Sequence, residues 1–245
     1  MREGAPARRR APDMTRSPSP RPSPRKRGEG ADSTTTFDAD RAAALKLCPA
    51  LSGALEELET YERLLRQWQP KINLISGQTL PQLWTRHFAD SAQLINLFPD
   101  FMRWADLGSG AGFPGMVVAL LLKGRPGAAV HLIESDQRKA AFLRAVSRET
   151  GAPAQVHLAR IEQALPPLVG QIDAICARAL APLPQLVDLS REHLLKNAVG
   201  VFLKGEDWAD ELTAAGRTDI FQYNCFESRT NPAARVIVVS KAAPK

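Results

Sequence analysis

The sequence predicts an α/β protein with a doubly wound, mostly parallel sheet. Three observations support this fold class. From residue 101 onward, short apolar runs typical of strands alternate with helical segments. The segment 106–115 packs four glycines into ten residues, directly after the first run and directly before a helix. The last two apolar runs are joined by Glu227–Ala234, which contains an Asn-Pro turn and no helical pattern, so a hairpin is expected there.

A helical layer is expected over residues 36–100. Leu55, Leu58, Tyr61, Leu65 and Trp68 recur at intervals of three and four, which is typical of one face of a helix. The expected helices of this layer are Ala42–Leu47, Ala54–Trp68, Leu80–Thr85 and Ala89–Leu97. Pro70 and Pro99 end the second and the fourth of them.

Residues 101–245 are expected to form the α/β domain. Its seven strands are predicted at Arg103–Leu107, Ala129–Glu134, Gln155–Leu158, Ile172–Arg178, Gly200–Lys204, Phe221–Phe226 and Arg235–Ser240. Its helices are predicted at Gly115–Leu122, Asp136–Thr150, Leu183–Leu194 and Ala209–Ala215. Ligands of such sheets bind at the carboxyl ends of the strands, so the site is expected there.

Residues 1–35 are expected to form a disordered, basic tail rich in Pro, Arg and Ser. Met1–Gly30 holds nine Lys and Arg against three acids, so it carries the whole net charge of +6 and the rest of the chain is neutral. Six of the nineteen prolines lie there and no apolar pattern does. Three interpretations stay open: non-specific RNA binding, a transit peptide, and an upstream extension without a role, with Met14 as another start.

Composition argues for a cytoplasmic protein without a metal site. The longest apolar run, Met116–Leu122, is far too short to cross a membrane, and no signal peptide is recognisable. Cys48, Cys176 and Cys225 are scattered, which indicates a reducing compartment and no zinc site. The four histidines lack metal-ligand spacing as well. Cys176 lies inside an apolar strand and is expected in the core.

The glycine-rich segment predicts a cofactor site, for which two cofactors compete. A dinucleotide fingerprint is G-x-G-x-x-G, but here Phe113 stands at the third glycine position. Pro114 removes an N–H that a pyrophosphate needs, and Asp106 would repel phosphate. S-adenosylmethionine carries an ammonium and a sulfonium and no phosphate, so it suits this loop better. Glu134, at the end of the second strand, can accept both ribose hydroxyls of either cofactor.

Several motifs together resemble the RsmG (GidB) family, from about residue 55 to residue 241. The motifs are Asn73-Leu74, Arg86-His87-Phe88-Ala89-Asp90-Ser91, Asp106–Gly115, Glu134-Ser135, Lys139, Phe142-Leu143, Arg178-Ala179 and Lys204-Gly205. The run DLGSGAGFPG is the most specific of them. Where the family usually has Trp-Asn, this chain has Trp68-Gln69-Pro70.

The resemblance implies a seven-stranded class I methyltransferase that transfers a methyl group from S-adenosylmethionine to N7 of a guanine in the decoding-region loop of 16S rRNA. It implies contacts to the cofactor from Gly108, Phe113, Ile161 and Glu162, with Arg178 at the mouth of the site. The residues themselves add Asp106, Gly110 and Glu134 to the expected cofactor site.

Guanine N7 has a free lone pair, so no general base is expected and catalysis should come from positioning. The expected positioning residues are Arg178, Lys204, Arg86 and His87. Because the folded part is neutral, RNA should bind to local patches. The further candidates for RNA contact are Arg63, Arg66, Lys71, Arg138 and Lys139, with Trp68 or Trp84 as stacking platforms.

The expected partner is 16S rRNA or the small ribosomal subunit, and the chain is expected to act as a monomer. Two alternatives remain: a small-molecule methyltransferase, and an RNA-binding assembly factor with a vestigial cofactor site.

Overall fold

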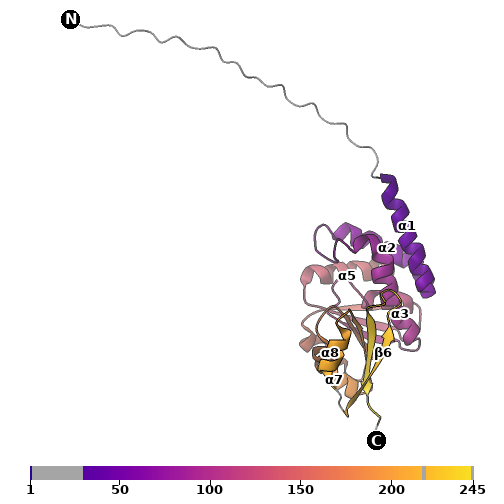
Figure 1. Ribbon diagram of the computed structural model, residues 1–245, viewed down its shortest axis with the longest axis vertical. Helices are drawn as coiled ribbons and strands as arrows, with labels where there is room; N and C mark the ends of the chain where they lie inside the picture. Colours follow the sequence, from indigo (N-terminus) through magenta and orange to yellow (C-terminus); the bar gives the residue numbers. More distant parts are fainter. Residues whose placement is uncertain (2–29, 217–218, 244–245) are drawn as a thin grey trace.

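The computed structural model describes residue 1, residues 30–216 and residues 219–243 (Figure 1). Residues 2–29 of the expected disordered tail therefore lie outside the described residues. Its predicted boundary at residue 35 needs correction, because helix α1 spans Gly30–Leu47. This helix begins well before the predicted start at Ala42.

The expected helical layer forms with two changes. It consists of α1, a 3-10 turn η1 (Pro49–Ala54), α2 (Leu55–Trp68), a 3-10 turn η2 (Leu80–Gln82), η3 (Trp84–Ala89) and α3 (Asp90–Leu97). The first change is that the predicted helix Leu80–Thr85 is split. The second is that η3 is a π-helix that runs directly into α3. Single turns of π-helix are rare and are frequent at functional sites.

All seven predicted strands are present, with boundaries within two residues. They are β1 (Arg103–Leu107), β2 (Ala129–Glu134), β3 (Ala154–Leu158), β4 (Ala174–Arg178), β5 (Val199–Lys204), β6 (Phe221–Glu227) and β7 (Arg235–Lys241). Their order in one sheet is β3-β2-β1-β4-β5-β7-β6. β4 begins later than predicted because the Asp173 carboxylate accepts from the N–H groups of Met102 and Arg103, which ties this residue to the start of β1.

Helices cover both faces of the sheet. They are α4 (Gly115–Leu122), α5 (Gln137–Thr150), the short α6 (Ile161–Ala164), α7 (Leu183–Leu195) and α8 (Trp208–Ala215), with a 3-10 turn η4 at Pro166–Leu168. Asp136 is the N-cap of α5, since its side chain accepts from Arg138 N and Lys139 N. Figure 1 shows α1, α2, α3 and α5 gathered at one side and α7 and α8 at the other. The apolar side chains form two clusters, one with the helical layer and α4–α5, the other with α7 and α8.

The predicted C-terminal hairpin is confirmed, and it fixes where the last loop lies. β7 pairs antiparallel with both β5 and β6, whereas the other neighbouring pairs are parallel. β6 therefore runs in the same direction as β5. The loop between β6 and β7 (residues 228–234) consequently emerges at the same carboxyl edge as the glycine-rich loop after β1.

Candidate active site

The glycine-rich loop is held in a conformation that only glycine adopts easily. Gly108, Gly110 and Gly112 all have positive φ, at 64°, 57° and 96°. A Cβ on Gly112 would lie 2.5 Å from the Tyr61 hydroxyl. That hydroxyl donates a hydrogen bond to Ala111 O. Helix α2 thus supports the loop through Tyr61. The sequence identifies this residue only by its helical spacing.

Asp106 lies beneath the loop rather than at its surface. Its side chain is fully buried, and Oδ2 accepts from Gly115 N at 3.1 Å. Burial raises the pKa of this carboxyl to about 7, although the bond from Gly115 opposes the rise. Cys176 is fully buried, as expected, and its Sγ lies 3.7 Å from Asp106 Oδ1. The structure therefore gives Asp106 a direct role in shaping the loop and no direct opening to a ligand.

Glu134 connects the loop to the end of β2. Its Oε2 accepts from Gly110 N at 2.8 Å, and its Oε1 accepts from Asp136 N at 2.7 Å. A carboxylate has about four acceptor sites, so these two bonds leave capacity for a ligand. The side chain is 8% exposed and borders the groove described next.

A groove of about 410 Å³ opens beside the glycine loop, and we call it the loop groove. Five residues of the expected cofactor site line it: Gly108, Gly110, Glu134, Ile161 and Glu162. It is also bordered by Ser135, Lys139, Ala159, Arg160, Ala179, Leu180 and others from α7. The carboxyl ends of β1, β2 and β3, where the sequence predicts a ligand site, thus surround one hollow.

Phe113 does not border the loop groove. Its ring is 5% exposed and stacks on His87, with ring centroids 4.8 Å apart, and on Tyr61 at 5.5 Å. The guanidinium of Arg178 lies over the ring, 5.0 Å from its centre. The ring thus joins the helical layer to the loop, and the expected contact of Phe113 with a cofactor stays a prediction.

The expected positioning residues line a second hollow. It has a volume of about 360 Å³ and we call it the basic cavity, because Arg86, Arg178, Lys204 and Arg235 border it. His87 borders it as well, and so do Asp90, Thr79 and part of the loop after β6. Arg178, which the resemblance placed at the mouth of the cofactor site, borders this cavity, and its expected contact with the cofactor stays a prediction.

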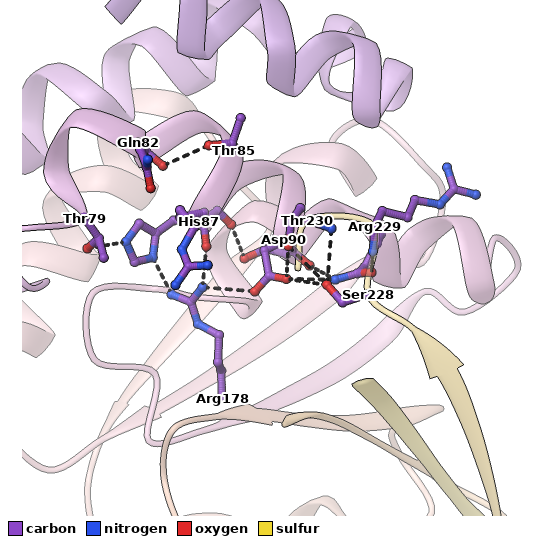
Figure 2. Close-up of polar contacts among 12 residues, drawn as sticks. Thr79, Gln82, Thr85, His87, Asp90, Arg178, Ser228, Arg229 and Thr230 are labelled. Atoms are coloured by element: carbon purple, nitrogen blue, oxygen red, sulfur yellow. Dashed lines mark hydrogen bonds and ion pairs between the residues drawn. The ribbon is translucent and has the colours of Figure 1, made fainter. Parts of the chain in front are cut away.

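A polar network fixes Arg178 and His87 (Figure 2). Arg178 Nη2 lies 2.7 Å from His87 Nδ1, and Nη1 donates to Arg86 O at 3.1 Å and pairs with Asp90 Oδ2 at 3.3 Å. Burial, together with the positive charges of Arg178 and Arg86, lowers the pKa of His87 to about 3. His87 is therefore neutral at physiological pH.

Lys204 is held as one member of a buried ion pair. Its Nζ lies 2.6 Å from Glu211 Oε2 and donates to Ala181 O at 2.9 Å. Glu211 Oε2 also accepts from Leu183 N at 2.6 Å. This cluster ties the end of β5 to the starts of α7 and α8, and its members Lys204 and Glu211 border the basic cavity.

The two hollows meet at one residue. Ala179, directly after β4, borders both the loop groove and the basic cavity. Its φ is +52°, which is unusual for a residue with a Cβ. Non-glycine residues in this region cluster at functional sites. Ala179 would therefore adjoin both a group held in the groove and a group held in the cavity.

The other expected RNA contacts are not gathered at the basic cavity. Arg63 pairs with Glu149 at 2.7 Å and Arg66 pairs with Glu62 at 2.7 Å. Trp84 is 2% exposed, and its Nε1 donates to Glu62, so it is a core residue rather than a platform. Lys139 borders the loop groove instead.

Gln69, which replaces the usual Asn of the resembled family, has a local structural role. Its Nε2 donates to Ile75 O, and its Oε1 accepts from the N–H groups of Leu74 and Ile75. The side chain thereby satisfies the backbone of the loop that follows Pro70.

Among residues 30–216 and 219–243, no three His, Cys, Asp or Glu side chains come together as a metal site. In the same part of the chain, no helix combines the length and apolarity needed to span a membrane.

The strand order, the antiparallel β7 and the glycine loop beside an acidic strand end together define a class I methyltransferase of the Rossmann-like α/β type. A model of the GidB family, described as rRNA small subunit methyltransferase G, matches residues 54–232. The chain belongs to this family.

Curated relatives support the assignment. The chain is 43% identical over 219 residues to the ribosomal RNA small subunit methyltransferase G of Bradyrhizobium diazoefficiens, covering 89% of this chain and 84% of that one. It is 50% identical over 186 residues to the protein of the same name from Parvibaculum lavamentivorans, covering 76% and 82%. With the corresponding protein of Rhodospirillum centenum it shares 51% identity over 192 residues, covering 78% and 86%.

Solved structures resemble the fold. A Corynebacterium glutamicum protein gives a TM-score of 0.51 at 14% identity, covering 76% of this chain and 91% of that chain. The cofactor-bound Rv0187 from MTB gives a TM-score of 0.50 at 15% identity, covering 80% and 91%. At these identities the likeness concerns the fold alone.

Proposed function

We propose that this protein transfers the methyl group of S-adenosylmethionine to N7 of a guanine in the decoding-region loop of 16S rRNA. The family assignment supports methylation of small-subunit rRNA. The donor and the target atom are inferred from the chemistry of the two hollows and from the resemblance.

The loop groove suits S-adenosylmethionine. Glu134 borders it with acceptor capacity left, which suits the two hydroxyls of a ribose. Ile161 and Leu180 supply apolar surface, and Glu162 supplies an acceptor for an adenine amino group. Gly108 and Gly110 leave the backbone free of side chains where it borders the groove. The bound donor would supply an activated methyl group on a sulfonium.

The residues of the basic cavity suit a reaction controlled by positioning. Guanine N7 already carries a lone pair, and its attack leaves no proton to remove, so a general base is unnecessary. His87 matches this requirement because it is buried, neutral and fully engaged by Arg178 and Thr79. The network instead orients Arg178 rigidly, and rigid alignment of reactants is worth up to several kcal/mol in such reactions.

One observation carries the proposal: the groove and the cavity share Ala179 at the carboxyl edge of the sheet. A methyl group in the groove and a base in the cavity would then be adjacent.

The direct test is methylation of small-subunit rRNA, both free and reconstituted into subunits, with labelled S-adenosylmethionine, followed by nucleoside analysis. We expect the label in 7-methylguanosine. Label in any other nucleoside would overturn the assignment of N7.

The two alternatives make different predictions. An assembly factor with a vestigial site would give no heat when S-adenosylmethionine is titrated into it. A small-molecule methyltransferase would not need the exposed guanidinium of Arg86, for which the described residues provide no hydrogen-bond or ion-pair partner. We expect Arg86→Glu to weaken rRNA methylation and to leave donor binding unchanged. We further propose that the protein acts as a monomer in the cytoplasm, where its rRNA substrate is assembled.

A further inference from the structure

The Asp90 carboxylate is shared between two walls of the basic cavity (Figure 2). Its Oδ2 pairs with Arg178 Nη1 at 3.3 Å, at the end of β4. Its Oδ1 accepts from Thr230 Oγ1 at 2.7 Å and from Ser228 Oγ at 3.4 Å, both in the loop between β6 and β7. Gln93, one turn along α3, adds a bond from its Nε2 to Oδ1. One side chain of the helical layer thus holds two segments that are distant in the sequence.

The loop between β6 and β7 forms a wall of the basic cavity. Ser228, Thr230, Asn231 and Ala234 border the cavity together with Arg86 and His87 of η3. A second bond fixes the loop to α3, because Gln93 Oε1 accepts from Arg229 N at 3.1 Å. Asn231 Oδ1 accepts from Ala233 N at 3.0 Å, which closes the turn within the loop. The wall is therefore held by α3 and not by the sheet alone.

We propose that the basic cavity holds the acceptor base, and that Asp90 is the positioning residue that fixes Arg178 on one side of that base and the loop 228–234 on the other. The inference rests on the proposed function, because it requires an acceptor nucleotide next to the methyl donor. It goes beyond it by assigning the residue that organises the cavity.

Size and hydrogen-bonding chemistry agree with a purine. The volume of about 360 Å³ falls within the range of small-ligand pockets, which begins near 300 Å³. Guanine presents two acceptors, O6 and N7, on one edge. Arg178 has five N–H donors, and its acceptors in the protein are Arg86 O, Asp90 and His87. It retains donors for O6 while N7 stays free for the methyl group.

Two substitutions separate the two sets of contacts that Asp90 makes. We call its ion pair with Arg178 the Arg178 arm, and its hydrogen bonds from Thr230 and Ser228 the loop arm. In Asp90→Asn, the amide oxygen is expected to face the donors Thr230, Ser228 and Gln93, which leaves the amide NH₂ facing the donors of Arg178. This variant therefore breaks the Arg178 arm. Thr230→Val removes one hydroxyl without a large change of shape and so weakens the loop arm. Asp100→Asn is the matched control, because Asp100 is exposed and precedes β1 at the opposite edge of the sheet.

The experiment measures three quantities for each variant: the Kd of S-adenosylmethionine by calorimetry, kcat/KM for the small-subunit rRNA substrate, and the midpoint of thermal unfolding. For Asp90→Asn we expect kcat/KM to fall about 10-fold or more, as for a lost hydrogen bond between charged groups, with the donor Kd unchanged within about twofold. Thr230→Val should give a smaller loss of the same kind. The double variant should lose less than the product of the two single losses, because both arms act through one carboxylate.

Three results would overturn the proposal: wild-type kcat/KM in Asp90→Asn, an equal loss of donor affinity, or independent effects in the double variant. If Asp90→Asn does not fold, Thr230→Val and Arg178→Lys test the two arms separately. Failure of the proposed function is recognised in the wild-type protein, which would then yield no 7-methylguanosine. Failure of this inference leaves wild-type methylation intact and appears only in the variants.

Discussion

The imidazole of His87 accepts a hydrogen bond from Arg178, with 2.7 Å between Nδ1 and Nη2. Arginine has donors only, so Nδ1 carries no proton. The proton of the neutral ring is therefore on Nε2, which lies 3.0 Å from Thr79 Oγ1 and donates to it. A protonated His87 would place two donors against each other and a cation beside Arg178. The network thus exists only with a neutral ring.

The first prediction concerns the pH dependence of stability. The pKa of His87 is lowered from 6.5 to about 3 in the folded protein. Between these values the unfolded chain binds a proton that the folded protein does not, so this residue makes stability rise with pH, by at most about 1.4 kcal/mol per pH unit. In His87→Gln this contribution is absent. The free energy of unfolding, measured with urea between about pH 4 and pH 6.5, should rise less steeply with pH in the variant than in the wild-type protein.

The buried Asp106 acts in the opposite direction, since its raised pKa makes stability fall as pH rises towards 7. It is present in both proteins and cancels in the comparison with His87→Gln. Equal slopes for the two proteins would show that His87 titrates normally.

The second prediction concerns Gly110. A Cβ there would meet only Gly108 O, at 3.8 Å, so a valine would point into open space beside the loop groove. We expect Gly110→Val to abolish binding of S-adenosylmethionine while the protein still folds, with some loss of stability from the positive φ. Gly170→Val is the control, because Gly170 has φ +76° and nothing within 4 Å. It carries a similar strain and should bind the donor normally. Donor binding by Gly110→Val would contradict the assigned groove.

The third prediction concerns Tyr61. Tyr61→Phe removes the hydroxyl that donates to the buried Ala111 O. An unpaired buried acceptor costs about 1–3 kcal/mol, so the midpoint of unfolding should fall and the glycine loop should bind the donor more weakly. The other tyrosine, Tyr223 on β6, is the control, and Tyr223→Phe should affect neither quantity. A stable Tyr61→Phe protein with wild-type donor affinity would argue against support of the loop from α2.

The fourth prediction concerns the Lys204–Glu211 pair. Both side chains are mostly buried, with side-chain exposures of 7% and 23%. Lys204→Met leaves the Glu211 charge without its cation, which costs about 3–5 kcal/mol in comparable buried pairs. Adding Glu211→Gln removes that charge and should recover part of the loss. Denaturant midpoints of Lys204→Met, Glu211→Gln and the double variant test this. If the losses of stability of the two single variants simply add in the double variant, the result would count against the pairing.

The strands were predictable because each is a short apolar run bounded by turn residues, and the glycine pattern located the loop after β1. The hairpin of β6 and β7 followed from the Asn-Pro turn. The π-helix η3 was not predictable, because no local pattern separates it from an α-helix. The burial of Phe113 depends on Tyr61 and His87, which approach from the helical layer. The role of Asp90 likewise depends on Thr230, which lies 140 positions further along the chain. Such tertiary contacts leave no periodic signal in the sequence.

Asp40 belongs to α1, outside the residues 54–232 that the family model matches. Its carboxylate accepts from the backbone N–H of Trp84 at 2.9 Å and from that of Thr85 at 3.3 Å, at the first turn of η3. Removal of residues 1–47, with the rest of the chain kept, would therefore uncap the segment that presents Arg86 and His87 while sparing the loop groove, which no residue of α1 borders within the described chain. A shortened protein of this kind should still bind the methyl donor but should bind RNA more weakly.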